Sequence, residues 1–98
     1  MTIIKVSANS RTAAVAGAIA GVMREHRFTE VQSIGAGAVN QAVKAIILAK
    51  GYLSNDNIDI VCVPEFVDVD IDGKVRTAIK ITIIPHGEDL PETTEPPL

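Results

Sequence analysis

Few residues of this chain have the chemistry that catalysis or metal binding requires. Cys62 is the only cysteine and lies in an apolar run, where a cysteine is usually part of the core. Neither His26 nor His86 has a cysteine or carboxylate at metal-ligand spacing, and no serine has a base close to it in sequence. The alternating acids of residues 68–72 favour the solvated face of a hairpin over a metal site. We therefore expect no catalytic residue, no bound metal and no cofactor.

The most distinctive segment is a glycine loop, Gly35-Ala36-Gly37, between the strand-like residues 31–34 and a helical pattern. Backbone N–H groups left open at a helix N-terminus attract anions, phosphate above all. A dinucleotide fingerprint would need glycine at position 40, where Asn40 stands, and no P-loop lysine follows the loop. Two interpretations stay open, a contact with one backbone phosphate and a tight turn without a ligand.

The pattern of apolar residues predicts six helices and strands. Gly51 is expected to end the second helix, and Pro64 to mark a sheet edge or a bulge. The expected elements are a strand at 2–7, a helix at 12–26, a strand at 29–34, a helix at 38–50 and extended segments at 58–71 and 74–84. The order is β-α-β-α-β-β, an α/β fold of the two-layer α+β sandwich type, with two helices on one face of a four-stranded mixed sheet.

Helical spacing also predicts which faces of the two helices are buried. The first helix is expected to bury Val15, Ile19, Val22 and Met23, and to pack its small-residue ladder, Ala13, Gly17 and Gly21, within the chain. In the second helix one arc holds Val39, Ala42, Val43, Ile46, Ile47 and Ala49, and the opposite arc holds Asn40, Gln41, Lys44 and Leu48. Leu48 is the apolar member of the polar arc and is a candidate partner surface.

The turn after the long extended segment can be formed in two registers. A two-residue loop, Asp72-Gly73, pairs Ile71 with Lys74. A three-residue loop, 71–73, instead pairs Asp70 with Lys74 and matches charges and apolar faces together. The three-residue loop is the register we expect.

Charge and composition divide the chain into a domain and a tail. The net charge is −3, but four acids fall in residues 86–98, so residues 1–85 hold nine bases and eight acids. The tail is acidic and rich in proline, and we expect it to be disordered. No apolar run reaches the roughly 18 residues of a membrane span, no secretory signal is visible, and a single cysteine suits a reducing compartment. The expected location is the cytoplasm.

Some stretches of the sequence are more specific than a general fold pattern: Lys5-Val6-Ser7, residues 15–22, Arg24-Glu25, residues 34–45, Ile71-Asp72-Gly73 and residues 76–80. Through these stretches the chain resembles the stage V sporulation protein S family over residues 3 to about 84. That family is similar in fold to the Alba group of chromatin and RNA-binding proteins. The acidic tail is the part that looks unlike the family.

The resemblance implies a dimer or larger homo-oligomer, a non-enzymatic regulatory role in spore development, and contact with DNA or RNA. By Alba-like placement and charge, the implied contact residues are Lys5, Asn9, Ser10, Arg11, Gly35, Ala36, Gly37, Asn40, Gln41 and Lys44. The positions where Alba-like loops carry lysines and arginines hold few bases here, and neither loop has an aromatic for base stacking. The alternative is a protein-interaction regulator of the same shape that binds no nucleic acid.

Overall fold

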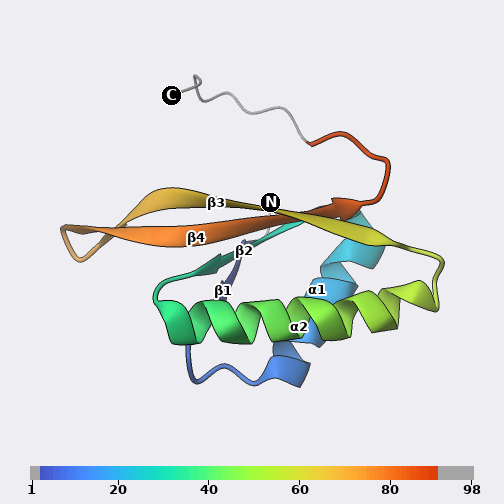
Figure 1. The fold of residues 1–98 in the computed structure, drawn as a ribbon, viewed down its shortest axis with the longest axis horizontal. Coiled ribbons are helices and arrows are strands. Elements are labelled where there is room, and N and C mark those ends of the chain that lie inside the picture. Colours follow the sequence, from blue (N-terminus) through green and yellow to red (C-terminus); the bar gives the residue numbers. More distant parts are fainter. Residues whose placement is uncertain (1–2, 91–98) are drawn as a thin grey trace.

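The computed structural model describes residues 3–90, and their element order is the β-α-β-α-β-β predicted from the sequence. The elements are β1 Ile3–Val6, α1 Thr12–His26, β2 Thr29–Ser33, α2 Ala36–Ser54, β3 Ile60–Ile71 and β4 Lys74–Pro85. They form one four-stranded sheet in the order β1-β2-β4-β3, with β1 and β2 parallel and the other neighbours antiparallel. Both helices lie on the same face of the sheet (Figure 1). The predicted fold class is confirmed.

The core lies between this sheet face and the two helices. Its largest fully buried side chains include Ile19 and Met23 of α1, Leu53 of α2 and Ile83 of β4. Alanines complete it, because Ala16 and Ala20 of α1 join Ala42, Ala45 and Ala49 of α2 in one cluster. Such small side chains let the two helix backbones approach closely.

The buried face of α2 is therefore its alanine face, and the arc expected from the sequence is only partly correct. Ala42 and Ala49 are buried as that arc required, but Val43 and Ile47 are exposed. The larger residues lie on the flank of the helix because the space against α1 admits only alanine. In α1, Ile19 and Met23 are buried as expected, whereas Val15 and Val22 are only partly covered.

The small-residue ladder of α1 does not pack within the chain, contrary to expectation. Ala13, Gly17 and Gly21 are exposed, and a Cβ added at either glycine would meet nothing within 4 Å. Cys62 is also exposed, although its apolar context suggested the core. It lies on β3, an edge strand that joins the core at Ile60 but leaves Cys62 uncovered, so an apolar sequence there does not imply burial.

Helix α2 continues past Gly51, which was expected to end it. The last turn is retained because Leu53 is fully buried against the core, and this outweighs a cost of up to about 1 kcal/mol for glycine inside a helix. At the other end α2 begins at Ala36, two residues before the expected start. Pro64 lies on the edge strand β3, as a residue without an N–H donor requires.

The hairpin adopts the two-residue register, so the three-residue loop expected from charge pairing is wrong. Ile71 pairs with Lys74, and Asp72 and Gly73 have φ of 52° and 81°. Two left-handed residues are what a type I′ turn needs, and its twist matches that of the strands. The Gly73 N–H also donates to Asp70 Oδ1 at 2.9 Å. These features outweigh exposed cross-strand charge pairs, which contribute at most about 1 kcal/mol each.

The segment after β4 is tied to the end of the fold where α1 finishes. The His86 N–H donates to the Asp59 carbonyl at 2.7 Å, and Arg27 donates to Glu88 at 2.8 and 3.0 Å. Residues 86–90 are the described part of the expected tail, and residues 91–98 lie outside the described residues. No helix within residues 3–90 is long and apolar enough to cross a membrane.

Candidate nucleic-acid interface

The loop from β1 to α1 is organised by its own serines. The Ser7 N–H donates to Ser10 Oγ at 2.9 Å, and the Asn9 N–H donates to Ser7 Oγ at 3.3 Å. These bonds occupy the hydroxyls inside the loop and leave the side chains of Asn9 and Arg11 exposed. Arg11 is the N-cap of α1 in extended conformation, and among the described residues no side chain caps this helix. The first amides of α1 are therefore not satisfied by a capping side chain.

The loop from β2 to α2 also leads into a helix whose first amides have no capping side chain. Its N-cap is Gly35, with φ 89° and ψ 155°, no side chain within residues 3–90 caps the helix, and its first turn holds no acid. The absence of a carboxylate preserves the partial positive charge of the helix N-terminus. Glycine is also needed at both positions for structural reasons. Gly35 has a positive φ, and a Cβ at Gly37 would lie 3.0 Å from the Cβ of Ala8.

Gln41 fastens these two loops to each other. Its Nε2 donates to the Ser10 carbonyl at 2.8 Å and lies 3.3 Å from Thr12 Oγ1. With the close approach of Gly37 to Ala8, this contact holds the β1–α1 loop and the start of α1 against the first two turns of α2, and in Figure 1 the loop passes below the start of α2. Gln41 is half-buried and its amide is hydrogen-bonded to the Ser10 carbonyl, so its role in the structure is to position the loops.

Two exposed cations accompany the paired loops. Arg11 begins α1, and Lys44 follows Gly37 and Asn40 on one stripe of α2 at positions i, i+3 and i+7. Neither cation forms an ion pair with another described residue, whereas Arg24 and Arg27 are paired with Asp56 and Glu88. Unpaired cations beside open amides form a surface that suits an anion.

Lys5 does not join this group. Its strand neighbours Ile4 and Val6 pack against the core on the helix-covered face, so alternation places Lys5 on the opposite face of the sheet. The structure thus brings together all the expected contact residues except Lys5. Ala36, the remaining expected residue, forms the first turn of α2 between the two glycines.

Comparison with known proteins identifies the family of this chain. The family described as "Stage V sporulation protein S (SpoVS)" matches residues 2–86. The chain belongs to the stage V sporulation protein S family. Among solved structures it is similar to Alba from Thermoplasma volcanium, with 13% identity and a TM-score of 0.59 over 85% of this chain and 99% of that one. At that identity the likeness shows an Alba-like fold.

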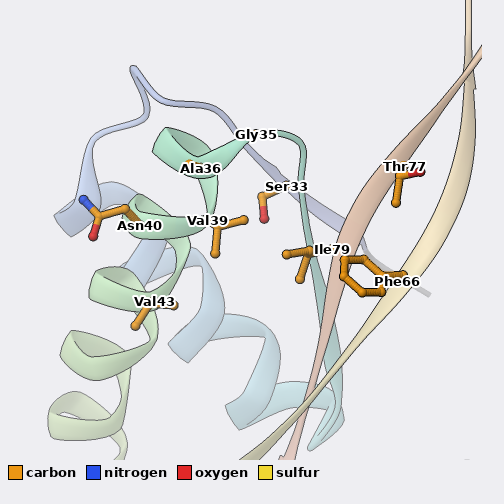
Figure 2. Close-up of a pocket in the computed structure, with 9 residues that line it drawn as sticks. All are labelled: Ser33, Gly35, Ala36, Val39, Asn40, Val43, Phe66, Thr77 and Ile79. Atoms are coloured by element: carbon orange, nitrogen blue, oxygen red, sulfur yellow. The ribbon is translucent and has the colours of Figure 1, made fainter.

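A groove opens beside the glycine loop of this family member. It measures about 620 Å³ and runs between α2 and the β3–β4 hairpin, with Val39 and Val43 on one wall and Phe66 and Ile79 on the other (Figure 2). Ser33 lies at its floor, 2% exposed, and its Oγ has no hydrogen-bond partner among the described residues. Sequence reasoning missed Phe66 because it is far from the loop in the chain and reaches the groove only through sheet pairing.

Within residues 3–90 no group of three or more His, Cys, Asp and Glu side chains is arranged to hold a metal ion. The acids of the hairpin are engaged locally, since Asp70 accepts from Gly73 and Asp68 Oδ1 lies 3.5 Å from Thr77 Oγ1. Burial raises the pKa of the Cys62 thiol, and nearby Lys50 lowers it by a smaller amount.

Proposed function

We propose that this chain is a non-enzymatic regulator of the stage V sporulation protein S family that binds the phosphate backbone of nucleic acid as a cytoplasmic homodimer. The observation that carries the proposal is that both helix N-termini lack a side-chain cap among the described residues and are linked through Gln41, with Arg11 at the start of α1 and Lys44 two turns beyond Gly37 on α2. Family membership supports the regulatory role in sporulation. The functional domain is residues 1–85, and residues 86–98 form an acidic tail outside it.

The number of cations limits the affinity of this surface. Each chain offers Arg11 and Lys44 at the paired loops, whereas Lys5 lies on the other sheet face, so this surface of a dimer makes on the order of four phosphate contacts. The loops hold no aromatic for base stacking. Asn9 and Asn40 are the exposed amides of this set available to read a base edge, because Gln41 is engaged with Ser10. Binding should therefore be moderate, dependent on salt and nearly independent of sequence.

A second function is favoured by a specific apolar pair. Leu48 and Tyr52 lie one turn apart on α2 and are 40% and 39% exposed. They support the alternative of a regulator that contacts another protein through this flank and binds no nucleic acid. Such a contact would depend weakly on salt and would be abolished in Leu48→Lys.

The two functions are separated by titrating labelled duplex and single-stranded oligonucleotides at several salt concentrations. Under our proposal, Arg11→Ala and Lys44→Ala each reduce the slope of log K against log salt by about one unit for every phosphate that the variant no longer neutralises. Arg24→Ala is the matched control, because Arg24 is ion-paired with Asp56 away from the loops. Equal slopes for all three variants would contradict the proposed surface.

A further inference from the structure

The sheet has an outer face that is turned away from both helices, and no helix or strand within residues 3–90 lies over it (Figure 1). Ile81 and Ile83 of β4 belong to the core on the other side, so alternation places the even-numbered residues of β4 on the outer face. Arg76 of β4 and Lys5 of β1 lie on this face, and both are exposed. The outer face therefore offers cations to a partner that lies across the strands.

Positive charge exceeds negative charge on the outer face. Its strand residues carry four bases and two acids, namely Lys5, Lys74, Arg76, Lys80, Glu30 and Glu65. Both acids are paired with Lys80, whose Nζ lies 3.7 Å from Glu30 Oε2 and 3.1 Å from Glu65 Oε1. Lys5 and Arg76 form no ion pair with another described residue. These two cations suit a segment that carries two acids.

The acidic tail starts on the same side of the sheet. Residues 86–90 follow the end of β4 at Pro85 and lie on the side away from the helices (Figure 1). Residues 91–98 come next in the sequence and contain Glu92 and Glu95 but no base. Prolines at positions 91, 96 and 97 favour an extended chain that advances about 3.1 Å per residue.

The reach of this tail matches the positions of the two cations. Glu92 and Glu95 follow Pro85 by seven and ten residues, which correspond to about 22 and 31 Å of extended chain. Lys5 lies two strands away from β4 at the level of residue 80, about 19 Å from Pro85. Arg76 is nine residues from Pro85 along β4, or about 30 Å. Each acid can therefore reach one cation.

From these observations we infer that residues 91–98 dock on the outer face of their own chain. Glu92 pairs with Lys5, and Glu95 pairs with Arg76. Covalent attachment favours this occupant over a free anion, because a short tether holds the acids at an effective concentration of about millimolar. Composition alone predicts disorder for the tail, but composition takes no account of the cations that the tail crosses. The inference goes beyond the proposed function and does not rest on it, since a docked tail leaves the paired loops open.

A nitroxide spin label on the tail tests this contact in the full chain. The label is attached through Thr94→Cys, with Cys62→Ser removing the native thiol, and amide signals are compared before and after the nitroxide is reduced. At low salt the signals of Gln32 and Ala78, in the strands under the tail, should lose at least about half of their intensity. Signals of Lys44, on the helix side of the sheet, should lose the least. The losses should shrink at high salt, because salt screens exposed charges.

Charge reversal then identifies the cations that hold the tail. Lys5→Glu combined with Arg76→Glu should abolish the loss at β2 and β4. Adding Glu92→Lys and Glu95→Lys to that variant should restore it, and this recovery shows that the reversed face is folded. Lys44→Glu is the matched control and should leave the loss unchanged.

Three results would overturn the inference. The first is a native chain without signal loss on the outer face at low salt, and the second is a loss that is greatest at the paired loops. The third comes from mixing spin-labelled chains with isotope-labelled chains that carry no nitroxide. Signal loss at Gln32 and Ala78 in that mixture, equal to the loss within one chain, would assign the contact to the tail of another copy.

Discussion

Gly35 has a backbone conformation that side chains rarely tolerate. Its φ of 89° with ψ of 155° lies in a region used almost only by glycine, and this conformation reverses the chain between the end of β2 and the start of α2. Gly37 is required for a different reason, the close approach of Ala8. The two interpretations left open by the sequence are thus compatible, because a turn that needs glycines also leaves the first amides of α2 without a cap.

Gly35→Ala should therefore destabilise the chain by about 1–3 kcal/mol, the usual cost of such backbone strain. Gly17→Ala is the control, since Gly17 is exposed within α1 and a Cβ there meets nothing within 4 Å. That change should stabilise the chain by up to about 1 kcal/mol through helix propensity. Urea denaturation measures both free energies, and the same sign for the two changes would contradict the assignment.

Cys62 permits a prediction about reactivity. Because burial raises the pKa of its thiol, the thiolate fraction at neutral pH is lower than in a free cysteine, even though the residue is exposed. The rate of iodoacetamide alkylation should rise with pH with a midpoint above that of a free cysteine. Lys50→Met should move the midpoint higher still, because the ammonium lowers this pKa. A midpoint below that of free cysteine would exclude the desolvated environment.

The helices illustrate what local pattern can and cannot predict. The bounds of α1, Thr12–His26, follow from its apolar spacing and match the structure. The end of α2 does not follow from the local pattern. Gly51 is a local signal for a helix end, whereas the burial of Leu53, which extends the helix, depends on the tertiary structure. The alanine face of α2 was equally hard to predict, since apolar size favours valine and isoleucine while the distance to α1 admits alanine.

The contact between the helix N-termini depends on Gln41. Gln41→Ala should cost about 1 kcal/mol of stability, because it removes the bond to the Ser10 carbonyl. It should also accelerate amide exchange in residues 8–12, which that bond holds against α2. Asn40→Ala, a change at the exposed neighbouring position, should leave both the urea midpoint and the exchange unchanged. Equal effects of the two changes would show that Gln41 does not fasten the loops.

The candidate site was predicted more completely than the apolar groove beside it. The contact residues came from the family resemblance and from the two loops, which lie where parallel β1 and β2 end at one edge of the sheet. Lys5 was misplaced because its side of β1 depends on the pairing register. The groove could not be foreseen, since Phe66 meets α2 only after β3 joins the edge of the sheet.

For the whole molecule, the decisive question is whether the paired helix N-termini and their cations bind backbone phosphate. The affinity of the native chain for a labelled oligonucleotide duplex, measured across a series of salt concentrations, answers it. With Arg11 and Lys44 of each chain making on the order of four phosphate contacts per dimer, we predict a slope of log K against log salt of roughly −4 and little dependence on sequence. No binding at low salt, or an affinity that salt leaves unchanged, would contradict the proposed function.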